Sequence, residues 1–108
     1  MADVVVIRTT LDSAELAEQL ARQAVEQRLA ACVQITPAIR STYRWQGEIE
    51  TATEWLLEIK TTPAMRQKTI DWLSSAHPYE LPEIIWRCDH ATRAYSDWVQ
   101  RETGVIDD

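Results

Sequence analysis

The hydrophobic positions along the chain follow two different periods, and these periods predict its secondary structure. Residues 3–9 (DVVVIRT) are β-branched or apolar at consecutive positions, which is typical of a central strand covered on both faces. After this run the apolar residues recur at helical spacing, and Asp12 followed by Glu15 resembles a capping box. We therefore expect a strand and then a helix that ends near Leu29.

Two long strand patterns follow the helix. The first covers residues 31–46 and contains Pro37, where we expect a bulge or a bend. Gln46 and Gly47 make a tight turn into the second, residues 47–61. The second pattern alternates most clearly, and one of its faces carries Ile49, Thr51, Thr53, Trp55, Leu57, Ile59 and Thr61. The chain thus contains a long β-hairpin.

The last third of the chain predicts a helix, a strand and another helix. Thr62 and Pro63 suit the N-cap and first position of a helix, which Pro78 ends because the residue before a proline avoids helical angles. Residues 82–89 are apolar on both faces and predict a strand. Residues 92–104 predict a final helix that ends at a glycine.

The element order is β, α, β, β, α, β, α, and it indicates an α+β fold. This order is that of a ferredoxin-like (split βαβ) antiparallel sheet with a long β-hairpin and an extra C-terminal helix. Because 108 residues are sufficient for one hydrophobic core, we expect a single domain over residues 1–108.

The length of the hairpin predicts self-association. Each arm would be about 50 Å long if fully extended, more than twice the length of the first strand, so much of the hairpin has no partner within the subunit. An exposed edge that carries Tyr43, Trp45 and Ile49 invites pairing, and we expect it to dock on another copy of the chain. We also expect neighbouring copies to cover the sheet face that the helices leave open.

Composition excludes several classes of function. The net charge is −6 and the eleven Lys and Arg residues are dispersed, which argues against nucleic acid as a partner. With two glycines the chain has no phosphate-binding glycine loop, and it has no apolar stretch long enough to cross a membrane. The first ten residues do not resemble a secretory signal, so we expect a cytoplasmic protein with reduced cysteines.

Five stretches together resemble the CutA divalent-cation tolerance family. They are LAACV (29–33), STYRWQGEIE (41–50), EWLLEIKT (54–61), HPYELPEI (77–84) and YSDW (95–98). The resemblance implies a ferredoxin-like subunit and a tight homotrimer, in which the hairpin crosses to the adjacent subunit. It also implies a cytosolic protein associated with tolerance of copper and other divalent ions, with an architecture similar to that of the trimeric PII signalling proteins.

The segment HPYELPE (77–83) permits two interpretations. It is a rigid connector between a helix and a strand, because its prolines preset both ends. It is also a candidate wall of a cleft between subunits, where charged and aromatic side chains would bind a small anionic ligand or a metal. The candidate ligand-binding residues are Trp45, Lys60, His77, Tyr79 and Glu80.

Cysteine and histidine give the candidate metal ligands. A thiolate suits Cu(I) or Zn(II), and alternation places Cys32 on the sheet face away from the helices if Val33 points to the core; the alternative is a buried cysteine in an interface. Cys88 and His90 would project to one side of a strand, in a segment where the family typically has a proline and a glycine-containing loop. With Asp89 or His77 they could chelate a soft ion, although two ligands make an incomplete zinc site.

These observations predict a non-enzymatic homotrimer that binds copper or another divalent metal ion and needs no organic cofactor. No spacing of cysteine and histidine defines a nucleophile with its base. One alternative is a PII-like sensor that binds a small anionic ligand in a cleft between subunits. Another is a structural trimer that contacts other proteins.

Overall fold

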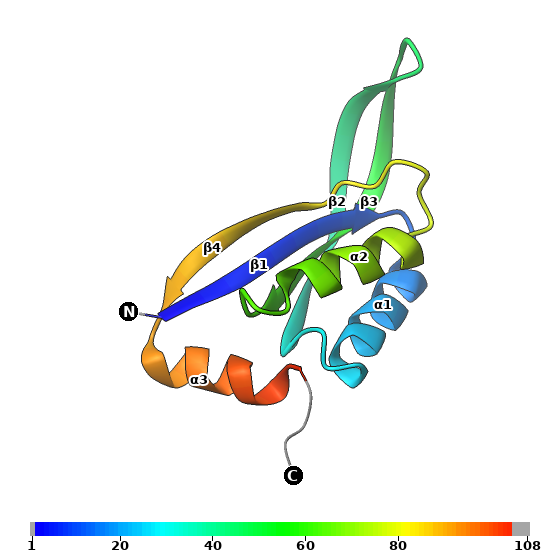
Figure 1. Cartoon of the computed structure of the whole chain (residues 1–108). Coiled ribbons are helices and arrows are strands. Elements are labelled where there is room, and N and C mark those ends of the chain that lie inside the picture. The colour runs from blue at the N-terminus through cyan, green and yellow to red at the C-terminus, as the bar shows by residue number, and fades with distance from the viewer. Residues whose placement is uncertain (1, 105–108) are drawn as a thin grey trace.

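The computed structural model describes residues 2–104 and forms one four-stranded antiparallel sheet with three helices. Its elements are β1 (Ala2–Leu11), α1 (Ala14–Glu26), β2 (Cys32–Trp45), β3 (Glu48–Thr61), α2 (Arg66–Ala76), β4 (Ile85–Ala91) and α3 (Arg93–Glu102). The strand order is β2-β3-β1-β4 (Figure 1). This arrangement confirms the predicted α+β ferredoxin-like fold with a long hairpin and a C-terminal helix.

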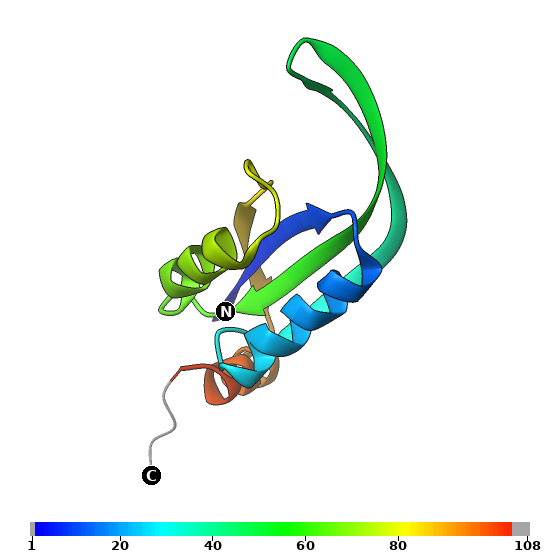
Figure 2. The same ribbon diagram turned by 90° about the vertical axis from the view of Figure 1, so that its right-hand side faces the viewer.

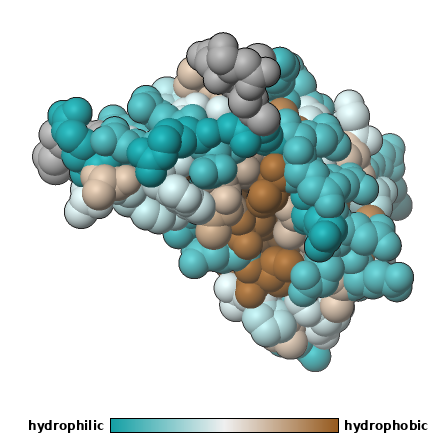
Figure 3. All heavy atoms as spheres, turned by 90° about the horizontal axis from the view of Figure 1, so that it is seen from below, coloured by the Kyte–Doolittle hydropathy of each residue, from teal (hydrophilic) through white to brown (hydrophobic). Residues whose placement is uncertain are grey.

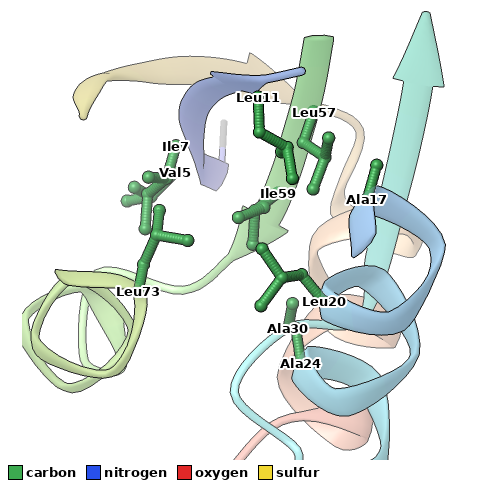
Figure 4. Packing of buried hydrophobic residues seen from close by; sticks show 10 residues of the cluster. All are labelled: Val5, Ile7, Leu11, Ala17, Leu20, Ala24, Ala30, Leu57, Ile59 and Leu73. Atoms are coloured by element: carbon green, nitrogen blue, oxygen red, sulfur yellow. The ribbon is translucent and has the colours of Figure 1, made fainter. Parts of the chain in front are cut away.

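The main core lies between one face of the sheet and helices α1 and α2 (Figure 4). Alternate residues of the two central strands point into it, as the period of two requires. The helices meet them with the stripe that the helical spacing predicts. The buried residues are Val5, Ile7, Leu11, Ala17, Leu20, Ala24, Ala30, Leu57, Ile59 and Leu73.

Helix α3 packs against the opposite face of the sheet, where Val99 joins Val4 and Val6 of β1 in a second buried cluster. The expectation that neighbouring copies would cover this face is therefore wrong for the part around Val4 and Val6, which α3 of the same chain covers. The apolar positions of α3 meet the sheet because the chain turns back under it after β4 (Figure 1). The consecutive apolar residues of β1 are explained by helices on both of its faces.

The hairpin of β2 and β3 extends well beyond the rest of the molecule (Figure 2). The pairing register shifts between Thr36 and Ile39, and Ala38 has a φ of 56°, so the predicted irregularity at Pro37 is confirmed as a bulge. Gln46 and Gly47 form the turn with φ values of 50° and 83°, as a tight hairpin turn of the primed type requires. The molecule measures 51 × 26 × 22 Å.

Two helix starts differ from the prediction. The N-cap of α1 is Ser13, whose hydroxyl accepts a hydrogen bond from the Leu16 amide at 3.1 Å; Asp12 stands one residue too early because β1 runs on to Leu11. Thr62 does accept a bond from the Met65 amide at 3.2 Å, but the turn that it caps precedes the helix, which begins at Arg66.

Two other ends are also shifted. Helix α1 stops at Glu26 and Arg28 takes a left-handed φ of 59°, so the helix is shorter than the expected end at Leu29. Strand β4 runs over Ile85–Ala91 instead of residues 82–89. Residues Ile85 and Trp86 are 53% and 49% exposed, because β4 is an edge strand that no described helix covers at that end.

Candidate functional site

The connector between α2 and β4 begins at His77, a buried histidine with both ring nitrogens bonded. Its Nδ1 accepts a hydrogen bond from the Tyr79 amide at 3.1 Å, and its Nε2 lies 3.0 Å from the Thr10 carbonyl oxygen. Since the carbonyl can only accept, Nε2 carries the proton and the imidazole is neutral. Burial lowers the pKa of His77, more than the Thr10 carbonyl and the carboxylates of Glu54 and Asp12 raise it.

Tyr79 joins this connector to the root of the hairpin. Its hydroxyl donates a hydrogen bond of 2.7 Å to Oε2 of Glu54 on β3. Its ring lies edge to face with the imidazole of His77, and the two ring centres are 4.9 Å apart. Burial and the bond to Glu54 raise the pKa of the Tyr79 phenol, so this group stays a donor. The bonds of His77 and Tyr79 thus tie one connector to both β1 and β3.

The structure does not bring the five candidate ligand-binding residues together within one chain. Lys60 lies opposite Val6 and Cys32 in the sheet, and its Nζ is 5.8 Å from the centre of the Tyr95 ring on α3. Six residues of strand β3, roughly 20 Å, separate it from the Glu54 that Tyr79 contacts.

The two remaining candidates lie apart from both places. Trp45 is at the far end of the hairpin, and Glu80 is an exposed residue of the connector. A cleft made of all five residues therefore requires more than one copy of the chain.

Cys32 lies where the alternation placed it. It is directly opposite Lys60 across the β2–β3 ladder, whereas Val33 packs against the main core. Its thiol is therefore on the sheet face away from α1 and α2, and the residue is half-buried.

Cys88 and His90 project to the same side of β4, opposite Val5 and Asp3. His90 Nδ1 lies 3.0 Å from the carboxylate of Asp3, and Cys88 is exposed. The two residues suggested as further ligands lie elsewhere: Asp89 points to the other face of β4, where it forms an ion pair of 2.9 Å with Arg87, and His77 is bonded near the opposite end of β1.

Sequence reasoning missed Glu54 and Asp3 because each acquires its role from a residue distant in the chain. Glu54 stands on the polar face of a strand pattern and is only 6% exposed, since the connector closes over it. At Asp3 the sequence pattern predicts only a strand, and the β1–β4 register sets this residue beside His90. Neither position carries a local signal that alternation could have revealed.

The donors of one chain do not form a complete metal site. Within residues 2–104 no group of three or more His, Cys, Asp and Glu side chains is arranged to hold a metal ion. At His77, an ion at either ring nitrogen would have to replace a hydrogen bond. A site with three protein ligands, as zinc usually requires, would need donors from more than one copy.

Comparison with known proteins agrees with this architecture. The family model described as "CutA1 divalent ion tolerance protein" matches residues 5–102. The chain belongs to the CutA family. The divalent-cation tolerance protein CutA of Thermus thermophilus is 43% identical over 105 residues, which cover 96% of this chain and 100% of that protein.

Other CutA proteins extend the comparison. Human protein CutA is 38% identical over 92% of this chain, but this chain spans only 56% of its length. The structure of CutA from Synechococcus elongatus PCC7942 superposes with a TM-score of 0.90 at 44% identity, covering 96% of this chain and 93% of that one. The CutA fold therefore accounts for almost the whole chain.

Proposed function

We propose that this CutA-family chain is a homotrimer that binds copper or another divalent metal ion weakly and contributes to metal-ion tolerance without catalysing a reaction. The observation that carries the metal part is Cys32, a half-buried thiol opposite Lys60 on the sheet face away from α1 and α2. A soft ion would take this thiolate from more than one copy, because one chain offers no three-donor group among its described residues.

Exposed apolar surface supports the assembly. Tyr43 and Ile49 on the hairpin and Ile85 and Trp86 on β4 are large hydrophobic residues open to solvent in the single chain. Seen from below, the molecule also presents a band of hydrophobic side chains between hydrophilic surroundings (Figure 3). Surfaces of this kind mark contacts between proteins, and a closed ring of identical copies would cover them.

Native mass spectrometry tests both parts of the proposal. The protein is measured with and without Cu(I), Cu(II) and Zn(II), beside a Cys32→Ser variant and a matched Cys88→Ser control. We expect a trimer that holds a fixed number of ions, loses them in Cys32→Ser and keeps them in Cys88→Ser. Ions lost only in Cys88→Ser, or a trimer that binds none, would contradict the metal part; a monomer at micromolar concentration would contradict the assembly.

A second candidate is a PII-like sensor of a small anionic ligand. It is favoured by the Lys60 ammonium over the Tyr95 ring, with Arg87 on the same sheet face. Inorganic phosphate is a suitable first probe, and its binding is monitored by tryptophan fluorescence. The Lys60→Gln variant should abolish the fluorescence change that phosphate causes. If the trimer responds to neither ions nor phosphate, a structural trimer that contacts other proteins becomes the better interpretation.

The cellular location remains a prediction. No helix within residues 2–104 is both long and apolar enough to cross a bilayer. A CutA of Archaeoglobus fulgidus is described as periplasmic and one of Arabidopsis thaliana as chloroplastic. We propose a cytoplasmic location for this chain, and cell fractionation followed by detection of the protein would test it.

A further inference from the structure

Glu54 is a buried carboxylate without a cationic partner among residues 2–104. It is 6% exposed, and its hydrogen bond comes from the neutral hydroxyl of Tyr79. None of the salt bridges among residues 2–104 includes it. Asp12, another carboxylate, also acts electrostatically on His77 and Tyr79 of the same connector.

The groups around Glu54 do not replace all the hydration that its carboxylate loses on burial. An ionised carboxylate removed from water loses several kcal/mol of hydration unless a cation and further hydrogen bonds replace it. One tyrosine donor replaces only part of that hydration. The second oxygen of Glu54 is not among the fully enclosed polar atoms without a partner, so it keeps some contact with the outside of the chain.

The hairpin carries cations that are unpaired within the described chain. Arg40 and Arg44 are exposed, and neither forms a salt bridge with residues 2–104. Arg40 is at the root of the hairpin and lies opposite Thr53, on the other face from Glu54. Arg44 is near the far end, opposite the exposed Ile49 and next to Tyr43 and Trp45.

We propose that Arg44 of a neighbouring copy completes the Glu54 site, so that each subunit's hairpin end forms an ion pair at the root of the next subunit's hairpin. The inference rests on the proposed homotrimer, which makes the hairpin end available to a neighbour. In a closed ring every copy both gives an arginine and receives one. Arg44 is the better candidate because it lies near the end of the hairpin, in the part that extends beyond the four-stranded sheet (Figure 2).

A double-mutant cycle on the assembly tests this pair. The dissociation constant of the assembly is measured by analytical ultracentrifugation for the wild type, Arg44→Ala, Glu54→Gln and the double variant. Each single change should raise it by roughly 30-fold or more, as breaking a buried charge pair does. The dissociation constant of the double variant should be about equal to that of the single variant whose assembly is weaker. Arg40→Ala is the matched control and should assemble like the wild type.

The outcomes separate this inference from the proposed trimer. If the two single effects simply multiply in the double variant, or if Arg40→Ala weakens the assembly as much as Arg44→Ala, the pairing is wrong although the trimer stands. If the wild type is monomeric at micromolar concentration, the trimer fails and the pairing fails with it. Far-UV circular dichroism of Glu54→Gln checks its fold, and the exposed Arg44→Ala gives an independent measure if that variant does not fold.

Discussion

At the scale of single residues, the connector after α2 has the clearest measurable properties. His77 is held neutral by one accepted and one donated hydrogen bond, and Tyr79 is held as a donor to Glu54. Each group is specified by its partners, so a change of one atom or one proton has a defined consequence.

His77 should make the protein less stable in acid. Its pKa is lowered from 6.5 in the folded state, so the unfolded chain binds the proton more readily. The contribution of neutral His77 to folding stability is complete above pH 6.5. It is lost as the pH falls from 6.5 through the lowered pKa of His77 in the folded state. The urea concentration at the unfolding midpoint is measured at pH 7.5 and at pH 5.0. This midpoint should fall less in His77→Gln than in the wild type, because glutamine keeps a donor and an acceptor but does not titrate.

The other histidine provides the control for this experiment. His90 is exposed and pairs with Asp3, so His90→Gln should not reduce the acid loss. An acid loss as large in His77→Gln as in the wild type would show that the connector is not its source.

Tyr79→Phe should destabilise the folded chain by about 1.5–3 kcal/mol, the usual contribution of a hydrogen bond to a charged group. The ring would still pack, but Glu54 would lose its donor. Urea unfolding at neutral pH gives the free energy, and Tyr43→Phe is the control because that tyrosine is 42% exposed. Equal effects of the two changes would contradict the role given to the Tyr79 hydroxyl.

At the scale of elements, α3 is attached through the loop that follows α1. Arg28 Nε donates to the Gly104 carbonyl at 3.0 Å, its Nη2 donates to the Arg101 carbonyl, and its own carbonyl accepts from the Gly104 amide at 2.8 Å. A cation at the last carbonyls of a helix also suits the helix dipole. This single residue therefore joins the ends of two helices that lie on opposite faces of the sheet.

Replacing Arg28 should loosen α3 selectively. Arg28→Ala removes the side-chain hydrogen bonds and leaves a non-glycine residue at a φ of 59°. Arg28→Gly removes the same bonds, but glycine adopts this left-handed conformation at a free-energy cost lower by about 1 kcal/mol. Hydrogen exchange should therefore speed up over residues 93–102 in both variants, and urea unfolding should find Arg28→Gly the more stable. Unchanged exchange in α3 would contradict the attachment.

At the scale of the whole molecule, the hairpin is longer than one subunit can use. Its far half pairs only with itself, while the near half joins the four-stranded sheet (Figure 2). An isolated two-stranded hairpin is marginally stable in water. A neighbouring copy is the simplest source of the missing contacts.

Ile49→Asp should abolish or greatly weaken self-association without unfolding the subunit. Ile49 is 68% exposed near the end of the hairpin, so the charge costs little in the single chain but would be buried in an assembly. Light scattering during size-exclusion chromatography gives the mass. Val25→Asp is the matched control, since Val25 is 43% exposed on α1; a trimer that survives Ile49→Asp would exclude this part of the hairpin from the interface.

The elements, their order and the faces that form the core follow from the sequence alone. The two periods, the bulge at Pro37 and the turn at Gln46 and Gly47 are local signals, since each depends on residues a few positions apart. The resemblance to CutA rested on short motifs of the same kind, and the family was confirmed. Helix ends shifted by a few residues because tertiary contacts, such as those that extend β1, compete with local caps.

Which distant residues meet follows from the three-dimensional packing and not from any local pattern. The packing of α3 under the sheet, the burial of Glu54 beneath the connector, the neutral form of His77, and the separation of Lys60 from Tyr79 all follow from the strand register and from how the connecting segments close over the sheet. Burial and pairing of this kind are properties of contacts between residues far apart in the chain, and no local pattern encodes them.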